Sequence, residues 1–112
     1  MCTKSELNII TSAVAMEAKR MLGDKLDAVI LYGSYARGDY DDESDIDIMV
    51  KIKGTRDDLR KYRYDLVDFC SDLSLEHDIT VSILLYDTET FDRYRNAMPF
   101  LRNVQKDGVH VA

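Results

Sequence analysis

Residues 28–50, AVILYGSYARGDYDDESDIDIMV, decide the fold expected of this chain. The run 28–32 is apolar throughout, which is typical of a strand covered on both faces. After a turn at Gly33 and Ser34, residues 45–50 alternate between polar and apolar side chains, as in a second strand. That alternation places Asp45, Asp47 and Met49 on one face and Ile46, Ile48 and Val50 on the other.

The flanking segments predict two main helices and a third strand. Apolar residues recur every three or four positions over residues 5–22 and 55–73, and Thr3 with Glu6 fits a capping box. Residues 78–86 alternate, which predicts a strand beginning at Asp78. A short helix after Asp87 or Thr88 and an edge strand near the end complete the pattern. The expected fold class is α/β (α+β), with a small mixed β-sheet flanked by helices.

Size and composition indicate one domain spanning residues 1–112, since 46% apolar residues suffice for one modest core. The longest apolar run is far shorter than the roughly 20 residues that cross a bilayer. Residues 1–8 lack the pattern of a secretory signal, so we expect a cytoplasmic protein without membrane contact. The two cysteines, Cys2 and Cys70, form no metal or disulfide spacing, and the apolar stripe around Cys70 favours burial over catalysis.

The charge balance bears on the class of substrate. With 21 acids against 15 bases, the chain carries a formal net charge of -6. Nucleic-acid backbones are attracted to basic surfaces, so direct nucleic-acid binding is not expected. A nucleoside triphosphate remains compatible with the charge if bound divalent cations offset the repulsion locally.

The Gly33-Ser34 turn is a candidate phosphate-binding site. It follows a buried strand, and residues 35–38 can open a short helix whose first amides face an anion. Glycine lets the backbone approach a phosphate closely, and the serine hydroxyl supplies a donor. The guanidinium of Arg37 can bind a phosphate or a partner protein, or simply lie at the surface. A plain strand-to-helix turn is the alternative interpretation of Gly33 and Ser34.

Asp45 and Asp47 are candidate metal ligands, because aspartate is disfavoured in strands and two of them alternate into this one. Residues two apart on a strand face lie roughly 6.6 Å apart, so their carboxylates can converge on one magnesium ion or bridge two. The alternative is a solvated acidic loop. We accept that alternative for the four acids that precede the strand: Asp39, Asp41, Asp42 and Glu43.

The series G-S-Y-A-R-G followed by S-D-I-D-I resembles the signature of the DNA polymerase beta-like nucleotidyltransferase superfamily, most closely its minimal, single-domain members. The resemblance implies the polymerase beta-like fold, with the triphosphate of ATP held at Gly33 and Ser34. It also implies two Mg²⁺ ions held by three carboxylates, which map to Asp45, Asp47 and Asp78. For Asp78, a helix-to-strand turn residue is the open alternative.

The same resemblance implies a magnesium-dependent nucleotidyltransferase that transfers AMP from ATP to an acceptor hydroxyl, with Asp78 helping to activate that hydroxyl. Minimal members commonly accompany a HEPN-domain toxin, which implies an antitoxin that adds AMP to a tyrosine of this partner. Two alternatives stay open: an antitoxin that only binds the toxin, and an enzyme that modifies a small molecule such as an antibiotic.

Overall fold

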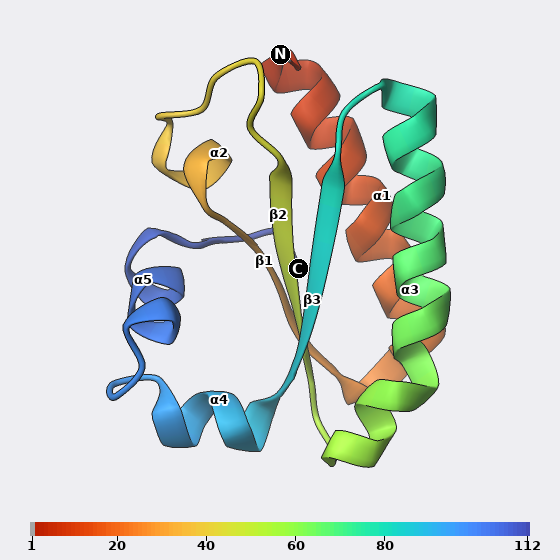
Figure 1. Cartoon of the computed structure of the whole chain (residues 1–112). Coiled ribbons are helices and arrows are strands. Elements are labelled where there is room, and N and C mark those ends of the chain that lie inside the picture. The colour runs from red at the N-terminus through yellow and green to blue at the C-terminus, as the bar shows by residue number, and fades with distance from the viewer. Residues whose placement is uncertain (1) are drawn as a thin grey trace.

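The computed structural model describes residues 2–112 and contains a four-stranded mixed sheet in the order β3-β2-β1-β4 (Figure 1). Strand β1 (Leu26–Tyr32) is antiparallel to β2 (Ile46–Ile52), and β2 is parallel to β3 (Val81–Asp87). The short β4 (Val109–His110) pairs antiparallel with the outer side of β1. The predicted mixed sheet is therefore confirmed, with both motif-bearing strands in its interior.

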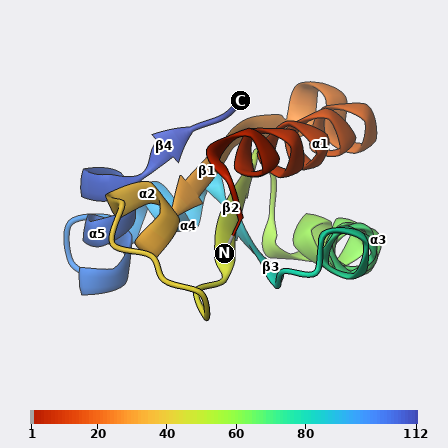
Figure 2. The same ribbon diagram turned by 90° about the horizontal axis from the view of Figure 1, so that it is seen from above.

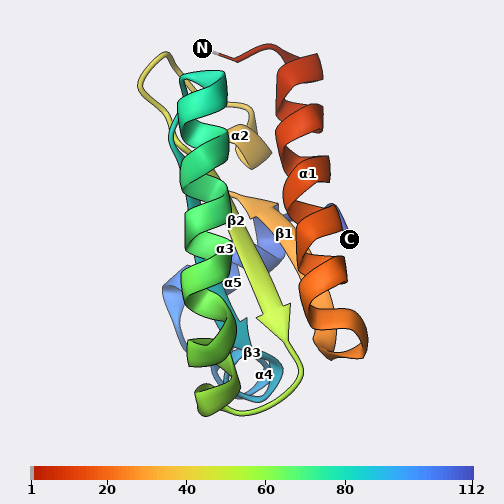
Figure 3. The same ribbon diagram turned by 90° about the vertical axis from the view of Figure 1, so that its right-hand side faces the viewer.

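Two long helices, α1 (Lys4–Leu22) and α3 (Arg56–His77), lie side by side over one face of the sheet (Figure 3). Their apolar stripes are buried against the face of β2 that carries its isoleucines and Val50. The spacing of three and four residues seen in the sequence therefore reports these buried stripes. The buried helix residues at the centre of this layer are Ile10, Val14, Ala18, Leu66 and Cys70.

A 3-10 turn, η1 (Gly23–Lys25), joins α1 to β1, and α2 (Ser34–Arg37) follows β1 and packs Tyr35 into the core under α1 and α3. The shorter helices α4 (Thr88–Tyr94) and α5 (Pro99–Asp107) flank the opposite face of the sheet (Figure 2). The core on this side is smaller, and it contains Ala28, Ile30, Met49, Phe91, Leu101 and Val104. Because helices flank both faces, the apolar run of β1 is buried on both sides, as its sequence predicts.

Side chains cap the helix starts at the predicted places. The Thr3 hydroxyl accepts the Glu6 N–H at 3.0 Å, and the Thr55 N–H donates to the Asp58 carboxylate at 2.9 Å. The Asp87 carboxylate accepts the Thr90 N–H at 2.9 Å and starts α4. These bonds satisfy amides that have no partner within their helices.

The predicted start of the third strand is wrong. Asp78 is the C-cap of α3, in the left-handed conformation with φ 53° and ψ 44°, and β3 begins only at Val81. The carbonyl of Ser74 accepts the N–H groups of Asp78 and Ile79, and these two hydrogen bonds end the helix at His77. Aspartate tolerates this conformation better than most residues. Asp78 consequently does not share the strand face of Ser82.

Cys2 and Cys70 are free thiols in buried positions, and burial raises the pKa of Cys70 to about 11, consistent with an unreactive core residue. No helix within residues 2–112 combines the length and the apolar composition needed to cross a membrane.

Candidate active site

The Gly-Ser turn joins β1 to α2 through a backbone conformation that favours glycine. Gly33 has φ 74° and ψ -155°, and its carbonyl accepts the N–H groups of Ala36 and Arg37, each at 3.1 Å. Gly38, with φ 88°, ends the single turn of helix and donates its N–H to the Ser34 carbonyl at 2.8 Å. The sequence therefore folds into the strand, turn and short helix that it predicts.

The turn and the acidic strand are in direct contact. A Cβ atom built on Gly33 would overlap the Oδ2 atom of Asp47, so only glycine allows this carboxylate to approach the turn so closely. Asp47 lies opposite Tyr32 of β1 and beside Ser82 of β3 in the sheet register. Asp45 lies one residue before the start of β2. The fold thus brings the predicted phosphate-binding turn onto the predicted metal-binding face.

The electrostatic environment of Asp47 depends on three neighbours. Partial burial raises the pKa of its carboxyl group, the negative charge of Asp45 raises it further, and the positive charge of Arg37 opposes both. Arg37 also pairs with Asp39, with 3.1 Å between Nε and Oδ2. Asp45 and Arg37 therefore act on Asp47 in opposite directions, and a cation placed between the two acids would relieve their repulsion.

Tyr32 also belongs to this site, although neither of the two sequence motifs includes it. Burial, the charge of Asp47 and the neighbouring Tyr86 raise the pKa of Tyr32 to about 12, so its hydroxyl stays neutral. Its ring contacts Phe100 of α5 edge-on, with 5.6 Å between centroids. The available signal was position, because Tyr32 directly precedes the Gly-Ser turn at the end of β1.

The site offers two carboxylates to a cation that prefers oxygen ligands. Asp45 and Asp47 supply oxygen atoms of the kind that Mg²⁺ prefers. Within residues 2–112, no three His, Cys, Asp or Glu side chains gather as a metal site, so Asp78 does not join the pair as a third ligand in this structure. The strand position beside Asp47 is occupied by Ser82 instead of an acid.

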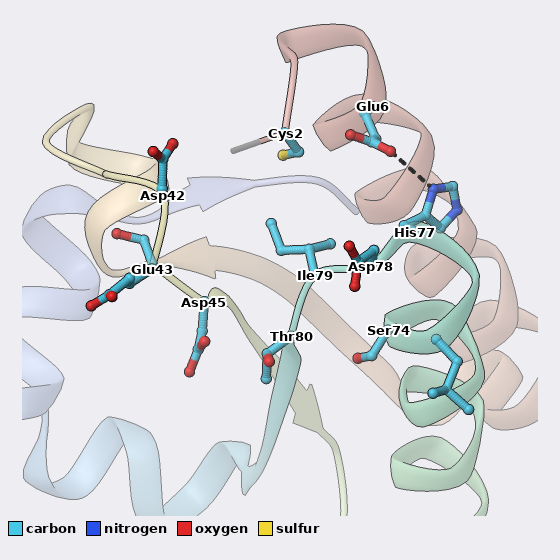
Figure 4. A pocket seen from close by; sticks show the side chains of 12 residues that line it. Cys2, Glu6, Asp42, Glu43, Asp45, Ser74, His77, Asp78, Ile79 and Thr80 are labelled. Atoms are coloured by element: carbon cyan, nitrogen blue, oxygen red, sulfur yellow. Dashed lines mark hydrogen bonds and ion pairs between the residues drawn. The ribbon is translucent and has the colours of Figure 1, made fainter.

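Asp78 does line a hollow of about 590 Å³ that also reaches Asp45 (Figure 4). The hollow lies between the start of α1, the loop before β2 and the end of α3, and His77 on its wall pairs with Glu6 at 3.4 Å. Gly33, Ser34 and Asp47 do not line it, so it borders the acid pair only at Asp45. The acidic lining residues are Glu6, Asp42, Glu43, Asp45 and Asp78.

The acidic loop before β2 is exposed to solvent, as predicted, and is organised by its own hydrogen bonds. The Asp41 carboxylate accepts the Glu43 N–H at 2.9 Å and the Ser44 hydroxyl at 3.2 Å. Tyr40 stacks on Tyr35 of α2, with ring centroids 4.3 Å apart, and attaches the loop to the Gly-Ser turn. These contacts hold the loop in a defined conformation between the Gly-Ser turn and the acid pair Asp45 and Asp47.

Comparison with known proteins agrees with this geometry. Residues 14–108 match the family model described as "nucleotidyltransferase domain". A proposed protein adenylyltransferase of Methanocaldococcus jannaschii is 46% identical over 66 residues, which are 59% of this chain and 65% of that relative. The match thus spans slightly less than two thirds of the relative's own length.

Two solved structures share the fold at 27% sequence identity. A proposed nucleotidyltransferase of Sulfolobus solfataricus superimposes on 97% of this chain and 87% of its own length, with a TM-score of 0.54. A chain from a mutant of the MntA-HpeT toxin–antitoxin superimposes on 88% of this chain and 68% of its own length, with a TM-score of 0.51.

Proposed function

This chain belongs to the nucleotidyltransferase domain family, and from that membership we propose that it transfers AMP from ATP to a hydroxyl group of a protein, using magnesium. The observation that carries the proposal is the contact between Gly33 and the Asp47 carboxylate, which joins a phosphate-binding turn to an acidic metal-binding face. The similarity to the Methanocaldococcus jannaschii protein supports adenylyl transfer in particular.

The Gly-Ser turn and the acid pair bind different parts of the nucleotide complex. Gly33 and Ser34 hold the phosphates of ATP through backbone amides and a hydroxyl, with Arg37 supplying positive charge nearby. Asp45 and Asp47 would hold Mg²⁺. Bound there, the metal would draw charge from the phosphates and offset their repulsion by a chain of net charge -6.

In the proposed transfer step, the oxygen of the acceptor hydroxyl attacks the α-phosphorus of ATP. The bond from that phosphorus to pyrophosphate breaks, pyrophosphate leaves, and the hydroxyl proton passes to a carboxylate. We assign this proton to Asp78, because Asp78 and Asp45 line the same hollow, where an acceptor hydroxyl can enter beside the acid pair.

The variant Asp78→Asn tests the proton assignment. Asparagine also tolerates the left-handed C-cap conformation, so the fold should be retained. The variant should bind ATP normally and transfer AMP at least ~100-fold more slowly, as expected for loss of a proton acceptor. Near-normal transfer, measured as AMP incorporation, would leave Asp78 with the capping role alone.

We propose that the acceptor is a tyrosine of a HEPN-domain toxin, so that the chain acts as its antitoxin. The shared fold with a toxin–antitoxin chain supports this partner. The acidic lining of the hollow also favours a protein segment over a nucleic acid, because a polyanion would be repelled there.

The acceptor proposal is tested with a purified HEPN-domain toxin as the candidate partner. Incubation with ATP and magnesium should add the mass of AMP to one of its tyrosines, detected by mass spectrometry. The double variant Asp45→Asn, Asp47→Asn should show no added mass, whereas Asp92→Asn, an exposed acid of α4, should behave as wild type. Inhibition of the toxin without added mass would contradict transfer and indicate an antitoxin that acts by binding.

A further inference from the structure

An aromatic pair lies next to the acid pair, on the side of the sheet away from α1 and α3 (Figure 2). Tyr32 is the last residue of β1, and the strand register places it directly opposite Asp47 of β2. Opposite residues of an antiparallel pair project from the same face of the sheet, with Cβ atoms roughly 4.5–5.5 Å apart. The ring of Tyr32 in turn contacts Phe100, near the start of α5, edge-on. The order along this surface is therefore Asp47, Tyr32 and Phe100.

Both aromatic side chains keep surface that the fold does not cover. Phe100 is 38% exposed, although Leu101 and Val104 of the same helix are buried. Tyr32 is half-buried against this core, and its hydroxyl has no hydrogen-bond partner within residues 2–112. In that range, the fully buried side-chain oxygen or nitrogen without a partner belongs to Tyr35, so the Tyr32 hydroxyl reaches solvent. A ligand can therefore contact the ring of Phe100 and form a hydrogen bond with Tyr32.

The other surroundings of the acid pair leave less room for a nucleoside. Toward α1 and α3 the sheet is closed, because Ile46 and Ile48 of β2 are completely buried. Beside Asp45 lies the acidic hollow, where the acceptor hydroxyl enters in the proposed transfer step. The aromatic pair adjoins Asp47 away from both, so a nucleoside held there would leave the hollow free for the acceptor.

The covalent structure of ATP matches the order of these residues. The α-phosphate is bonded to the ribose, and the base is attached to the far side of the ribose. With the phosphates held at the Gly-Ser turn and the acid pair, the ribose would lie beside Tyr32 and the base beside Phe100. Ribose hydroxyls can exchange hydrogen bonds with a phenol, and a base stacks favourably on an aromatic ring. Both groups are uncharged, so a chain of net charge -6 does not repel them.

We propose that Tyr32 and Phe100 form the nucleoside subsite of the active site, where the Tyr32 hydroxyl bonds to the ribose and the Phe100 ring stacks on the base. The proposal rests on the proposed function, because it takes the triphosphate to be held at the Gly-Ser turn. Every base has a flat face, so stacking on Phe100 strengthens the binding of any nucleotide and does not by itself select adenine.

Calorimetry with two ligands tests the subsite in the presence of magnesium. The ligands are ATP and tripolyphosphate, which lacks the nucleoside. Phe100→Ala should bind ATP about tenfold more weakly than wild type, the scale expected for loss of one stacked base, and should bind tripolyphosphate as wild type does. Tyr94→Ala removes a similarly exposed ring of α4 and should leave both affinities unchanged.

Tyr32→Phe tests the hydroxyl alone, because the ring and its packing are kept. The variant should bind ATP about fivefold more weakly than wild type, as expected for loss of one hydrogen bond. The nucleotide 2′,3′-dideoxy-ATP lacks both ribose hydroxyls, so the variant and wild type should bind it equally. A hydroxyl with a merely structural role would weaken the binding of both nucleotides alike, and that result would overturn the ribose contact.

Thermal unfolding checks that each variant is folded. If Phe100→Ala is not, Phe100→Leu takes its place, since leucine keeps an apolar contact and removes the aromatic face. Unchanged ATP binding, or equal losses for ATP and tripolyphosphate, would overturn the subsite and leave the proposed function standing. A wild type that binds neither ligand with magnesium would overturn the proposed function and the subsite with it.

Discussion

At the scale of single residues, Gly33 is the position where backbone conformation and chemistry coincide. Both Gly33 and Gly38 have positive φ, but only at Gly33 would a Cβ atom meet another residue. Denaturant unfolding of Gly33→Ala should therefore show a free energy of unfolding about 1–3 kcal/mol below that of wild type. The same variant should lose magnesium-dependent ATP binding. Gly38→Ala carries backbone strain alone and should lose about 1 kcal/mol while keeping ATP binding. Equal ATP binding by both variants, measured by calorimetry, would contradict the role of the Gly33-Asp47 contact.

Asp47 gives a prediction with a defined pH dependence. The raised pKa of Asp47 means that its carboxyl group binds a proton more tightly in the folded state than in the unfolded state. The contribution of Asp47 to the free energy of unfolding should therefore fall as the pH rises from the ordinary pKa of aspartate through the raised pKa of Asp47. Without metal, Asp47→Asn should therefore be more stable than wild type at pH 7, and this difference should vanish at acidic pH. Magnesium should stabilise wild type and not the variant, as thermal unfolding at several pH values can measure. A variant less stable than wild type at pH 7 without metal would contradict the pKa direction.

Ser82 allows a test by addition instead of removal. It lies beside Asp47 on the neighbouring parallel strand, about 4.8 Å away across the sheet. Ser82→Asp should place a third carboxylate on this face, which should strengthen magnesium binding several-fold and destabilise the metal-free protein by about 1 kcal/mol. Ser82→Asn is the matched control of similar size without the charge. Unchanged magnesium affinity in the aspartate variant would place position 82 outside the metal site.

At the scale of elements, the start of α4 depends on one buried carboxylate. Asp87 is only 6% exposed and accepts the Thr90 N–H, so Asp87→Ala removes the cap and leaves that amide unsatisfied. Unfolding in urea should show a loss of about 1–2 kcal/mol for alanine and a much smaller loss for Asp87→Asn, which keeps an acceptor oxygen. Similar losses for both variants would assign the effect to burial of the side chain and not to capping.

The end of α3 and the start of β3 illustrate how one element limits another. The alternation from Asp78 to Tyr86 continues into β3 and correctly predicts that a strand exists. The helix nevertheless runs to His77, and the Ser74 carbonyl accepts the N–H groups of Asp78 and Ile79. These amides are therefore not free to pair with β2 in a longer strand. Boundaries between neighbouring elements are therefore set by competition for backbone hydrogen bonds.

At the scale of the whole molecule, nucleotide and metal should stabilise the protein only together. A ligand that binds the folded state at 100 times its Kd adds about 2.7 kcal/mol of stability. Because the chain is acidic, a triphosphate without magnesium should bind poorly and shift the Tm little. A non-hydrolysable ATP analogue with magnesium should raise the Tm by several degrees, and EDTA should abolish the rise. An equal rise without magnesium would contradict a metal-dependent site.

The sequence by itself determined the elements and the chemistry that they carry. Apolar residues three or four apart mark α1 and α3, alternation marks β2, and the pair of motifs around Gly33 and Asp47 marks a nucleotidyltransferase. These signals are readable in one dimension because helix and strand periods, capping residues and turn chemistry act over a few neighbouring positions.

Only the tertiary structure decided which of these residues meet. The contact of Gly33 with Asp47, the place of Tyr32 beside that carboxylate, and the presence of Ser82 on the next strand depend on strand pairing between distant segments. The position of Asp78 at the C-cap of α3, and not on the strand face of Ser82, depends on where α3 ends. Hydrogen bonds between strands fix register to one residue, and a shift of one residue would turn Asp47 to the opposite face. No local pattern could therefore have specified which of these side chains meet.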